Sequence, residues 1–588
     1  MKQFLKMLFA SAIGTFIGIL CLIVISIVAI YAGFSSASKV TYVPDRNENI
    51  LKISMTGTID DYAEESPLAV LLNDEPPLSL KDILTAIDRA KTNDDVKGVY
   101  LDIGHFSTGT ACVDAIRRAL KDFGESGKFT VAYADNYSQG GYYLASVADH
   151  VYLNPKGLVT LQGLSSETMF YKGLLQKAGI EMEVFKVGTY KGAVEPFTSN
   201  RLSDANREQI TSYMGGIWKN VVREIADSRH LIAADIHHFA DEGLFFADAS
   251  AAVECGLIDS LQYRFEVEAS VKKLSGQTSK ELESLSVSEM IKVKTSTREY
   301  RNKVAVIYAE GEIVESAGEP YLIAQKNITE SLSRKLRGLE ENEEVKAVVL
   351  RVNSPGGSAY VSEQIWRQVD KLNKKKPVVV SMGSVAASGG YYISCAARKI
   401  VAEPNTLTGS IGIFGIFPNI SGLFGKLDLT TDVVKTNRYA DLGDASRPMT
   451  NDERALIQAY VERGYDLFLS RCAEGRGMSR DAIDAIAQGR VWTGEQGLEL
   501  GLVDELGGID RAIELAVELA NIYNYTLINV PVSKNSIKDM LQKQLGAAKI
   551  SMVKEVIGSE EYEIASLLQQ IRTMHGIKAR IPYDMKPL

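Results

Sequence analysis

An internal repeat with a nearly constant spacing constrains the fold of this chain more than any other feature of its sequence. The stretch "YSQGGYYLA" around Gln139 returns as "AASGGYYIS" around Ser388, at a shift of 249 positions. This register holds without net gain or loss from about residue 101 to residue 191. Such an ordered series predicts two copies of one domain. Further pairs at the same shift are Leu101 with Leu350, Pro155 with Pro404, and Lys186 with Lys435.

The repeat also sets the predicted domain boundaries. The first copy spans residues 49–265 and the second spans residues 303–532. Between them, residues 266–302 are polar and charged and are interpreted as a linker that is helical in part. The tail, residues 533–588, has a helical pattern without a counterpart after the first copy, and we interpret it as a packing or assembly helix.

Within a copy, short runs of β-branched residues alternate with helical patterns. Near-continuous apolar runs at residues 345–352, 377–384 and 399–405 predict parallel strands that are buried on both faces. Residues 362–375 form an amphipathic pattern opened by Ser362, which predicts a helix with a serine cap. Alternation of this kind is typical of an α/β domain with a mostly parallel sheet.

The N-terminal segment predicts a membrane anchor within residues 1–38. As a helix, residues 7–34 would be about 42 Å long, which exceeds the ~30 Å hydrocarbon core of a bilayer. This segment carries no charge, and Lys2 and Lys6 precede it, so the N-terminus is expected in the cytoplasm and the rest of the chain outside it. The alternative is a cleaved signal that ends in the small residues 35–38.

Charge and cysteine content exclude several classes of function. The formal net charge is −9 and the isoelectric point is about 5.5, which argues against a nucleic-acid partner. None of the cysteines shows the C-x-x-C spacing of zinc or redox sites, which excludes the usual cysteine signatures of such sites. The five cysteines are Cys21, Cys112, Cys255, Cys395 and Cys472.

Ser388 is a candidate nucleophile because it stands between a predicted strand and a predicted helix. Unpaired N–H groups at a helix N-terminus can stabilise an oxyanion that forms when a serine attacks a carbonyl. A serine here could also be only a helix cap, but Gln139 at the matching position shows that the fold does not require one. The nearby motif "NSPGGSA" at residues 353–359 can supply further backbone N–H groups, and its first-copy counterpart lacks Pro-Gly-Gly.

A serine nucleophile needs a base, and the repeat suggests a lysine. No histidine lies in the core of the second copy, so a Ser-His-Asp triad is poorly supported, although a histidine of the first copy could reach. In the first copy, Lys191 of "VGTYKGAVEPF" falls on Ala440 of the second at the same shift. The first copy therefore keeps the lysine and lacks the serine, and the second copy does the reverse. The ordinary interpretation of a lysine is a solvated surface residue, which this reciprocity weakens.

These motifs together resemble the signal peptide peptidase A family in its long, duplicated bacterial form. The motifs "GTYKGAVEPF", "NSPGGSA" and "SVAASGGYYIS" carry the resemblance, which covers most of the chain. It implies two tandem ClpP/crotonase-like α/β domains after an N-terminal transmembrane helix. It also implies that Ser388 is the nucleophile and Lys191 the general base, with Gly356, Gly357 and Gly389 at the oxyanion and substrate-binding site. No metal or cofactor is implied.

The resemblance further implies a membrane-anchored serine endopeptidase that degrades cleaved signal peptides and other apolar peptides through an acyl-enzyme. We expect a single-pass protein of the bacterial inner membrane, with its catalytic part on the periplasmic side and a homotetrameric ring as its assembly. A non-catalytic scaffold that binds peptides or only assembles is the main alternative. An acyl-CoA enzyme on the same fold is a weaker one, because its substrate would be absent outside the cytoplasm.

Overall fold

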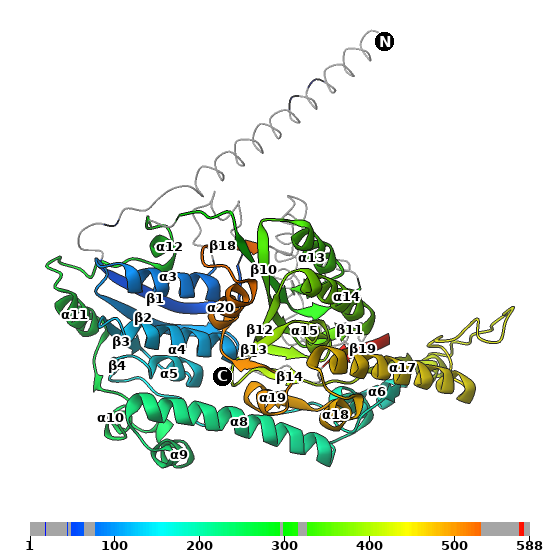
Figure 1. Ribbon diagram of the computed structural model, residues 1–588. Coiled ribbons are helices and arrows are strands. Elements are labelled where there is room, and N and C mark those ends of the chain that lie inside the picture. The colour runs from blue at the N-terminus through cyan, green and yellow to red at the C-terminus, as the bar shows by residue number, and fades with distance from the viewer. Residues whose placement is uncertain are drawn as a thin grey trace, which may run out of the picture.

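In the computed structural model, two mostly parallel sheets lie side by side, and a long helix, α8 (Asp204–Arg229), runs beneath both (Figure 1). Blue and cyan elements form the first copy, and green to orange elements form most of the second. The two copies that the repeat predicts are thus two α/β units. The structure describes residues 49–63, 77–294, 298–315, 326–530 and 576–580, together with Gly14, Gly18 and Pro44.

The first copy has a five-stranded sheet in the order β1-β2-β3-β4-β6, and all of its neighbouring strands are parallel. Successive side chains of β2 face opposite sides of the sheet. Leu101 packs with α3 and α4 on one side, and Tyr100 packs with α11 on the other. The strands are β1 (Ile50–Thr58), β2 (Gly98–Ser107), β3 (Phe129–Ala134), β4 (His150–Leu153) and β6 (Ser260–Leu261).

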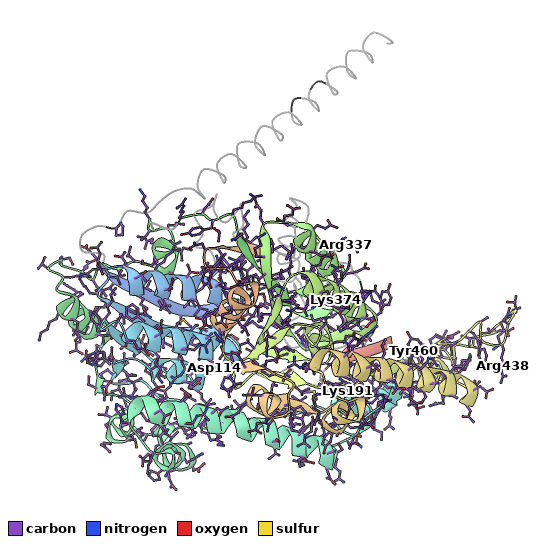
Figure 2. The ribbon with its side chains drawn as sticks, viewed as in Figure 1. Asp114, Lys191, Arg337, Lys374, Arg438 and Tyr460 are labelled. Atoms are coloured by element: carbon purple, nitrogen blue, oxygen red, sulfur yellow. The ribbon has the colours of Figure 1, made fainter. Side chains whose placement is uncertain are left out.

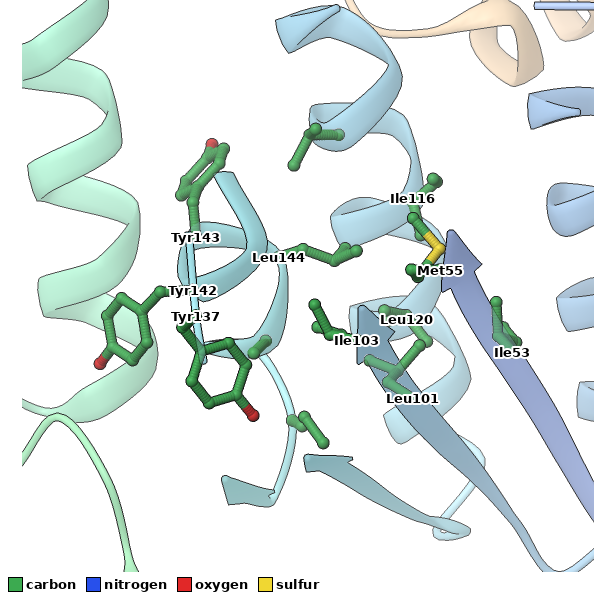
Figure 3. Packing of buried hydrophobic residues seen from close by; sticks show 14 of the residues in the cluster. Ile53, Met55, Leu101, Ile103, Ile116, Leu120, Tyr137, Tyr142, Tyr143 and Leu144 are labelled. Carbon is green, nitrogen blue, oxygen red and sulfur yellow. The ribbon is translucent and has the colours of Figure 1, made fainter. Parts of the chain in front are cut away.

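Helices of the first copy cover its sheet and extend from it. The short helix α5 carries Tyr142, Tyr143 and Leu144 into the main apolar core (Figure 3). The helices are α3 (Leu80–Thr92), α4 (Thr110–Gly124), α5 (Gln139–Ala145), α6 (Lys172–Ala178), η1 (Gly192–Val194), α7 (Glu195–Thr198), α8, α9 (Ala233–Asp241), η2 (Leu244–Phe246), α10 (Ser250–Glu254), α11 (Arg264–Ser275) and α12 (Val287–Met290).

The second copy has an eight-stranded sheet with the path β16-β14-β12-β10-β7-β18, and β13 joins β12 to β17. Its pairs are parallel except for β14 with β16. The predicted strands at residues 345–352, 377–384 and 399–405 correspond to β10, β12 and β13. The strands are β7 (Lys303–Glu310), β10 (Val345–Ser354), β12 (Val378–Ala387), β13 (Lys399–Ala402), β14 (Leu407–Gly409), β16 (Val491–Thr493), β17 (Glu505–Leu506) and β18 (Thr526–Val530).

Helices pack on both faces of this second sheet as well. Leu350 of β10 shares an apolar cluster with Ile365 of α14, whereas Val349 shares one with Leu515 of α20 on the opposite face. Ser358 caps α14 and Ser362 lies inside it, so the predicted cap at Ser362 is wrong by one turn. The helices are α13 (Ser331–Glu341), α14 (Ala359–Lys375), α15 (Gly389–Ser394), α16 (Ser421–Lys426), α17 (Asn451–Arg476), α18 (Arg480–Ile486), α19 (Gly494–Glu499) and α20 (Ile509–Ala520).

A third sheet joins the two copies and the tail in the order β5-β15-β19-β11-β8-β9. Its strand β5 comes from the first copy and pairs antiparallel with β15 of the second. Strand β19 comes from the tail, and the rest of the tail, for which a helix is expected, lies outside the described residues. The strands are β5 (Glu181–Lys186), β8 (Glu312–Ile313), β9 (Asn327–Ile328), β11 (Gly356–Ser358), β15 (Phe414–Asn419) and β19 (Gly576–Arg580).

Two segments outside the predicted copies complete the description. Residues 266–302 include most of α11 and all of α12, and Leu285 forms a parallel bridge with Leu51 of β1. No helix within the described residues is long and apolar enough to cross a membrane. Apart from Gly14 and Gly18, residues 7–34 lie outside the part of the chain that the structure describes.

Candidate active site

Ser388 stands at the junction of β12 and α15 in a conformation that is rare for a residue with a side chain. Its φ is 56° and its ψ is −114°, and it is fully buried. Its backbone N–H donates to the carbonyl of Gly409 at 2.8 Å. The Ser388 hydroxyl makes no capping hydrogen bond to α15, whereas Ser138 of the first copy caps α5 through Gly141. The Ser388 side chain therefore does not cap the helix, although the residue stands at its N-cap position, and strain of this kind gathers at functional sites.

Lys191, from the first copy, reaches this serine across the boundary between the copies. Its Nζ lies 2.8 Å from Ser388 Oγ, and 3.1 Å from both the carbonyl oxygen and the Oγ of Ser410. The lysine is fully buried, at the place marked in Figure 2. Burial removes water from its ammonium group and lowers the pKa of Lys191 well below the ordinary lysine value. The ordinary interpretation of Lys191 as a surface lysine is thus wrong.

Ser410 is a site residue that the sequence reasoning missed. It follows β14 with a φ of 48°, and its backbone N–H donates to the carbonyl of Arg490 at 2.6 Å. This left-handed conformation turns both oxygens of Ser410 toward Lys191. A signal was available, because the shift of 249 aligns Ser410 with the apolar Leu161 of the first copy. The site thus has two second-copy serines that the first copy lacks.

Contacts that involve the second copy hold the backbone of Lys191 and of the residue before it. Gln209 of α8 donates through Nε2 to the carbonyl of Tyr190 at 2.8 Å, and its Oε1 accepts from the N–H of Val491 at 3.0 Å. Gly489 lies so close that a Cβ there would come within 2.7 Å of the Lys191 N and Cβ atoms. A side chain at position 489 would therefore displace the lysine.

A second group of contacts fixes the turn that follows Lys191. Glu195 accepts from the Ser203 hydroxyl at 2.6 Å and from the Asn206 amide at 3.0 Å. A Cβ at Gly192 would lie 2.1 Å from the Asn206 side chain, so this close approach requires glycine. The motif "KGAVEP" is thus needed in part for the packing of the turn against α8.

The three glycines that the resemblance assigns to the oxyanion and substrate-binding site lie beside Ser388. Gly356 and Gly357 have φ angles of 99° and 151°, in the region that glycine tolerates. A Cβ on Gly356 would lie 2.7 Å from the backbone nitrogen of Gly389, and a Cβ on Gly389 would lie 3.1 Å from that of Gly357. The glycine-rich turn therefore packs directly against the residue that follows Ser388.

The matching positions of the opposite copies take no part in this site. Gln139, at the place of Ser388, accepts hydrogen bonds from the backbone N–H groups of Gln162 and Gly163. Ala440 is exposed, close in sequence to Arg438 on the projecting arm of Figure 2. Residues 430–435 lie outside any strand of the described chain, although the repeat aligns them with β5. The copies therefore differ in structure here, and the aligned pair Lys186 and Lys435 is not equivalent.

Hydrolysis by a serine and a neutral amine is the chemistry that these groups can perform. The buried lysine and the strained serine are within hydrogen-bond distance, next to glycine backbone that packs too closely for any side chain. Among the described residues, no group of three or more His, Cys, Asp or Glu side chains could hold a metal ion.

Comparisons with known proteins agree with this geometry. The sequence model of peptidase family S49 matches residues 122–278 and 370–523, one segment in each copy, and that of Clp protease matches residues 320–408. Protease 4 of Haemophilus influenzae is 35% identical over 85% of this chain and 83% of its own length. Protease 4 of Salmonella typhi is 35% identical over 82% of this chain and 78% of its own. The chloroplastic serine protease SPPA of Arabidopsis thaliana is 31% identical over 91% of this chain and 78% of its own length.

The tandem matches fit the two copies, and the identities extend over most of the chain and of its relatives. They confirm the family that the three motifs predicted from the sequence. The chain therefore belongs to peptidase family S49, as a homologue of signal peptide peptidase A, and it is a serine peptidase.

Proposed function

We propose that this serine peptidase hydrolyses apolar peptides, cleaved signal peptides among them, with Ser388 as nucleophile and Lys191 as general base. The observation that supports this most is the 2.8 Å contact between Lys191 Nζ and Ser388 Oγ inside the buried seam between the copies. A non-catalytic scaffold would have no need to bring the two side chains together from opposite copies.

The base must be neutral to accept a proton, and burial favours the neutral amine. A neutral amine has two N–H groups and one lone pair. The carbonyl and hydroxyl oxygens of Ser410 can accept both N–H groups at 3.1 Å, which leaves the lone pair directed at the Ser388 hydroxyl. In this arrangement Ser410 is a positioning residue for the base.

The reaction then follows the order of other serine peptidases. Ser388 Oγ attacks the peptide carbonyl carbon as its proton passes to Lys191 Nζ. Backbone N–H groups of Gly389 and of the Gly356–Gly357 turn stabilise the oxyanion, and Lys191 gives its proton to the leaving amine. Lys191 next takes a proton from water, which attacks the acyl-enzyme and frees Ser388.

Location and assembly belong to the same proposal. The uncharged residues 7–34 would anchor the chain in the bacterial inner membrane, with the catalytic part on the periplasmic side. The anchored chains would assemble as a homotetramer. An anchored peptidase would meet signal peptides at the bilayer surface, where their apolar segments gather.

Peptide hydrolysis by the detergent-solubilised full chain tests this proposal. The wild type should cleave a synthetic signal peptide, and Ser388→Ala should lose that activity while it keeps the wild-type circular dichroism spectrum. A matched control is Ser138→Ala, which removes the cap of α5 in the first copy and should leave turnover largely unchanged. Retained hydrolysis by folded Ser388→Ala would rule out this serine as the nucleophile.

A further inference from the structure

A short segment of the second copy, residues 488–492, contacts the backbone beside both the proposed base and its acceptor. The carbonyl of Gln488 accepts from the N–H of Tyr190, the residue before the base, at 2.9 Å. Two residues later, the carbonyl of Arg490 accepts from the N–H of Ser410 at 2.6 Å. The backbone of this segment therefore joins the part of the first copy that carries the lysine to the serine that accepts from it.

The Arg490 side chain forms a second link to the same place, because it lies between two aromatic rings. Its guanidinium carbon is 4.7 Å from the centre of the Tyr190 ring and 4.4 Å from that of the Trp492 ring. Its Nη1 donates to the Tyr190 hydroxyl at 3.1 Å. Its Nη2 lies 3.0 Å from Glu208 of α8, which also accepts from the Tyr190 hydroxyl at 3.3 Å. The guanidinium therefore joins Tyr190 of the first copy to Trp492 of the second.

These contacts need the flat, many-donor group of arginine. A guanidinium can stack on an aromatic face while its N–H groups donate at the edge, which a lysine ammonium cannot do. The Arg490 side chain is 20% exposed, and its Nε is buried without an acceptor among the described residues. The fit of Arg490 thus depends on stacking and on its two terminal nitrogens.

The same segment also packs against Lys191 itself. A Cβ on Gly489 would lie 2.7 Å from the Lys191 backbone nitrogen and Cβ, so the segment helps to cover the lysine. Because Tyr190 and Lys191 are consecutive, any movement of the tyrosine would carry the base with it. Lys191 Nζ is only 2.8 Å from Ser388 Oγ, and a displacement of less than 1 Å is costly for such a pair.

We propose that Arg490 is a positioning residue for the base. Its guanidinium holds Tyr190 against residues 488–492, which keeps Lys191 within reach of Ser388 and Ser410. This inference rests on the proposed function, because Arg490 acts on the reaction only through Lys191.

The pH dependence of fluorophosphonate labelling at Ser388 in the full chain tests the inference. Arg490→Met should lower the labelling rate about tenfold, because it removes the stacked cation and both donors. The rise of the rate with pH should also move to higher pH, because a looser seam admits water and returns the pKa of Lys191 toward its ordinary value. Tyr190→Phe keeps the ring and loses the hydroxyl, so its rate should lie between those of the wild type and Arg490→Met.

An arginine of similar setting in the first copy provides the matched control. Arg264 lies over the ring of Tyr133, at 4.9 Å from its centre, and pairs with Asp102 at 2.6 Å. Arg264→Met removes a stacked cation and an ion pair away from the proposed site. It should keep the labelling rate and the pH profile of the wild type.

Arg490→Lys decides the question where Arg490→Met does not fold. It keeps the charge but not the planar group, so its rate and pH profile should resemble those expected for Arg490→Met. A folded Arg490→Lys or Arg490→Met protein with the rate and pH profile of Arg264→Met overturns this inference alone. Labelling of Lys191→Met at the wild-type rate contradicts the proposed function and this inference with it.

Discussion

Lys191 has its charge state set by burial and by uncharged neighbours. Its three hydrogen-bond partners are neutral oxygens, and desolvation lowers its pKa well below the ordinary value near 10.4. Because only the neutral amine can act as the base, kcat/KM should rise with pH through this lowered pKa. The rise should be complete below the pH at which an ordinary lysine titrates. A profile of kcat/KM against pH checks this, and a flat profile from weakly acidic to alkaline pH would contradict it.

The same lowered pKa has a consequence for stability. Between the folded and unfolded pKa values of Lys191, the unfolded chain binds more protons than the folded chain, so stability should rise as pH increases through that window. Lys191→Met removes this contribution, and its free energy of unfolding should depend less on pH there than that of the wild type. Urea unfolding at several pH values measures the difference. Equal pH dependence in both proteins would show that Lys191 does not titrate below its ordinary range.

Ser410 should contribute through its hydroxyl without being essential. Ser410→Ala removes one 3.1 Å acceptor from Lys191 Nζ and keeps the carbonyl. The loss of one hydrogen bond of about 1 kcal/mol corresponds to a decrease in kcat/KM of roughly fivefold to tenfold. Steady-state kinetics measure the effect, with Ser410→Thr as the variant that keeps the hydroxyl and should recover part of the loss. Unchanged kinetics for Ser410→Ala would leave Ser410 without a positioning role.

At the scale of elements, the sequence predicts best what depends on local pattern. Buried β-branched runs located β10, β12 and β13, and the difference between Gln139 and Ser388 indicated the serine that we propose as the nucleophile. The repeat also indicated Lys191, because reciprocal loss is visible without a structure. These features share one property, namely that a few consecutive residues carry the signal.

The third sheet could not be predicted in this way. Its strands have two to six residues, and β5, β15 and β19 pair across sequence separations of well over a hundred residues. Nothing in a short run such as "GIKAR" specifies its partners. For the same reason β19 within the tail could not be predicted, and the contribution of Ser410 follows only from its φ and its two contacts with Lys191.

Helix α8 should affect catalysis through a single side chain. Gln209→Leu removes the hydrogen bonds to Tyr190 and Val491 that hold the Lys191 backbone against the second copy. We expect kcat to fall by about tenfold, since misplacement of a catalytic group by less than 1 Å is costly, while KM changes little. Gln209→Glu keeps the acceptor for Val491 but places a buried carboxylate beside the carbonyl of Tyr190, so it should be no faster than Gln209→Leu. Ser212→Ala, which loses only a contact with Gln496, is the control and should match the wild type.

A result in which Gln209→Leu and Ser212→Ala lower kcat equally would show that α8 acts only by joining the copies. The kinetic comparison needs both variants to have the wild-type melting temperature within a few degrees.

At the scale of the whole molecule, a buried ion pair joins the copies. Arg351 of β10 donates to both carboxylate oxygens of Asp61, and the two side chains are 2% and 4% exposed. Arg351→Met leaves a buried carboxylate without its partner and should cost about 3–5 kcal/mol of stability. Urea unfolding measures this cost. The double variant Asp61→Leu with Arg351→Met should be more stable than Arg351→Met, because no unpaired charge remains.

A second ion pair between the copies is the matched control. Arg223 of α8 lies 3.6 Å from Glu495 of α19, and both side chains are more than a third exposed. Solvent screens such a pair, so Arg223→Met should cost less than about 1 kcal/mol. A loss of similar size in Arg223→Met and Arg351→Met would contradict the view that burial makes the Asp61 pair important.

The central claim is that the nucleophile of one copy depends on the base of the other. Labelling of Ser388 by a fluorophosphonate, followed by mass spectrometry of the full chain, tests this without any choice of peptide substrate. We predict that the wild type is labelled at Ser388 and that Lys191→Met and Lys191→Arg are both labelled about 10²–10⁴-fold more slowly, since neither side chain can accept the proton. Labelling of folded Lys191→Met or Lys191→Arg at the wild-type rate would show that the base lies elsewhere and would contradict the claim.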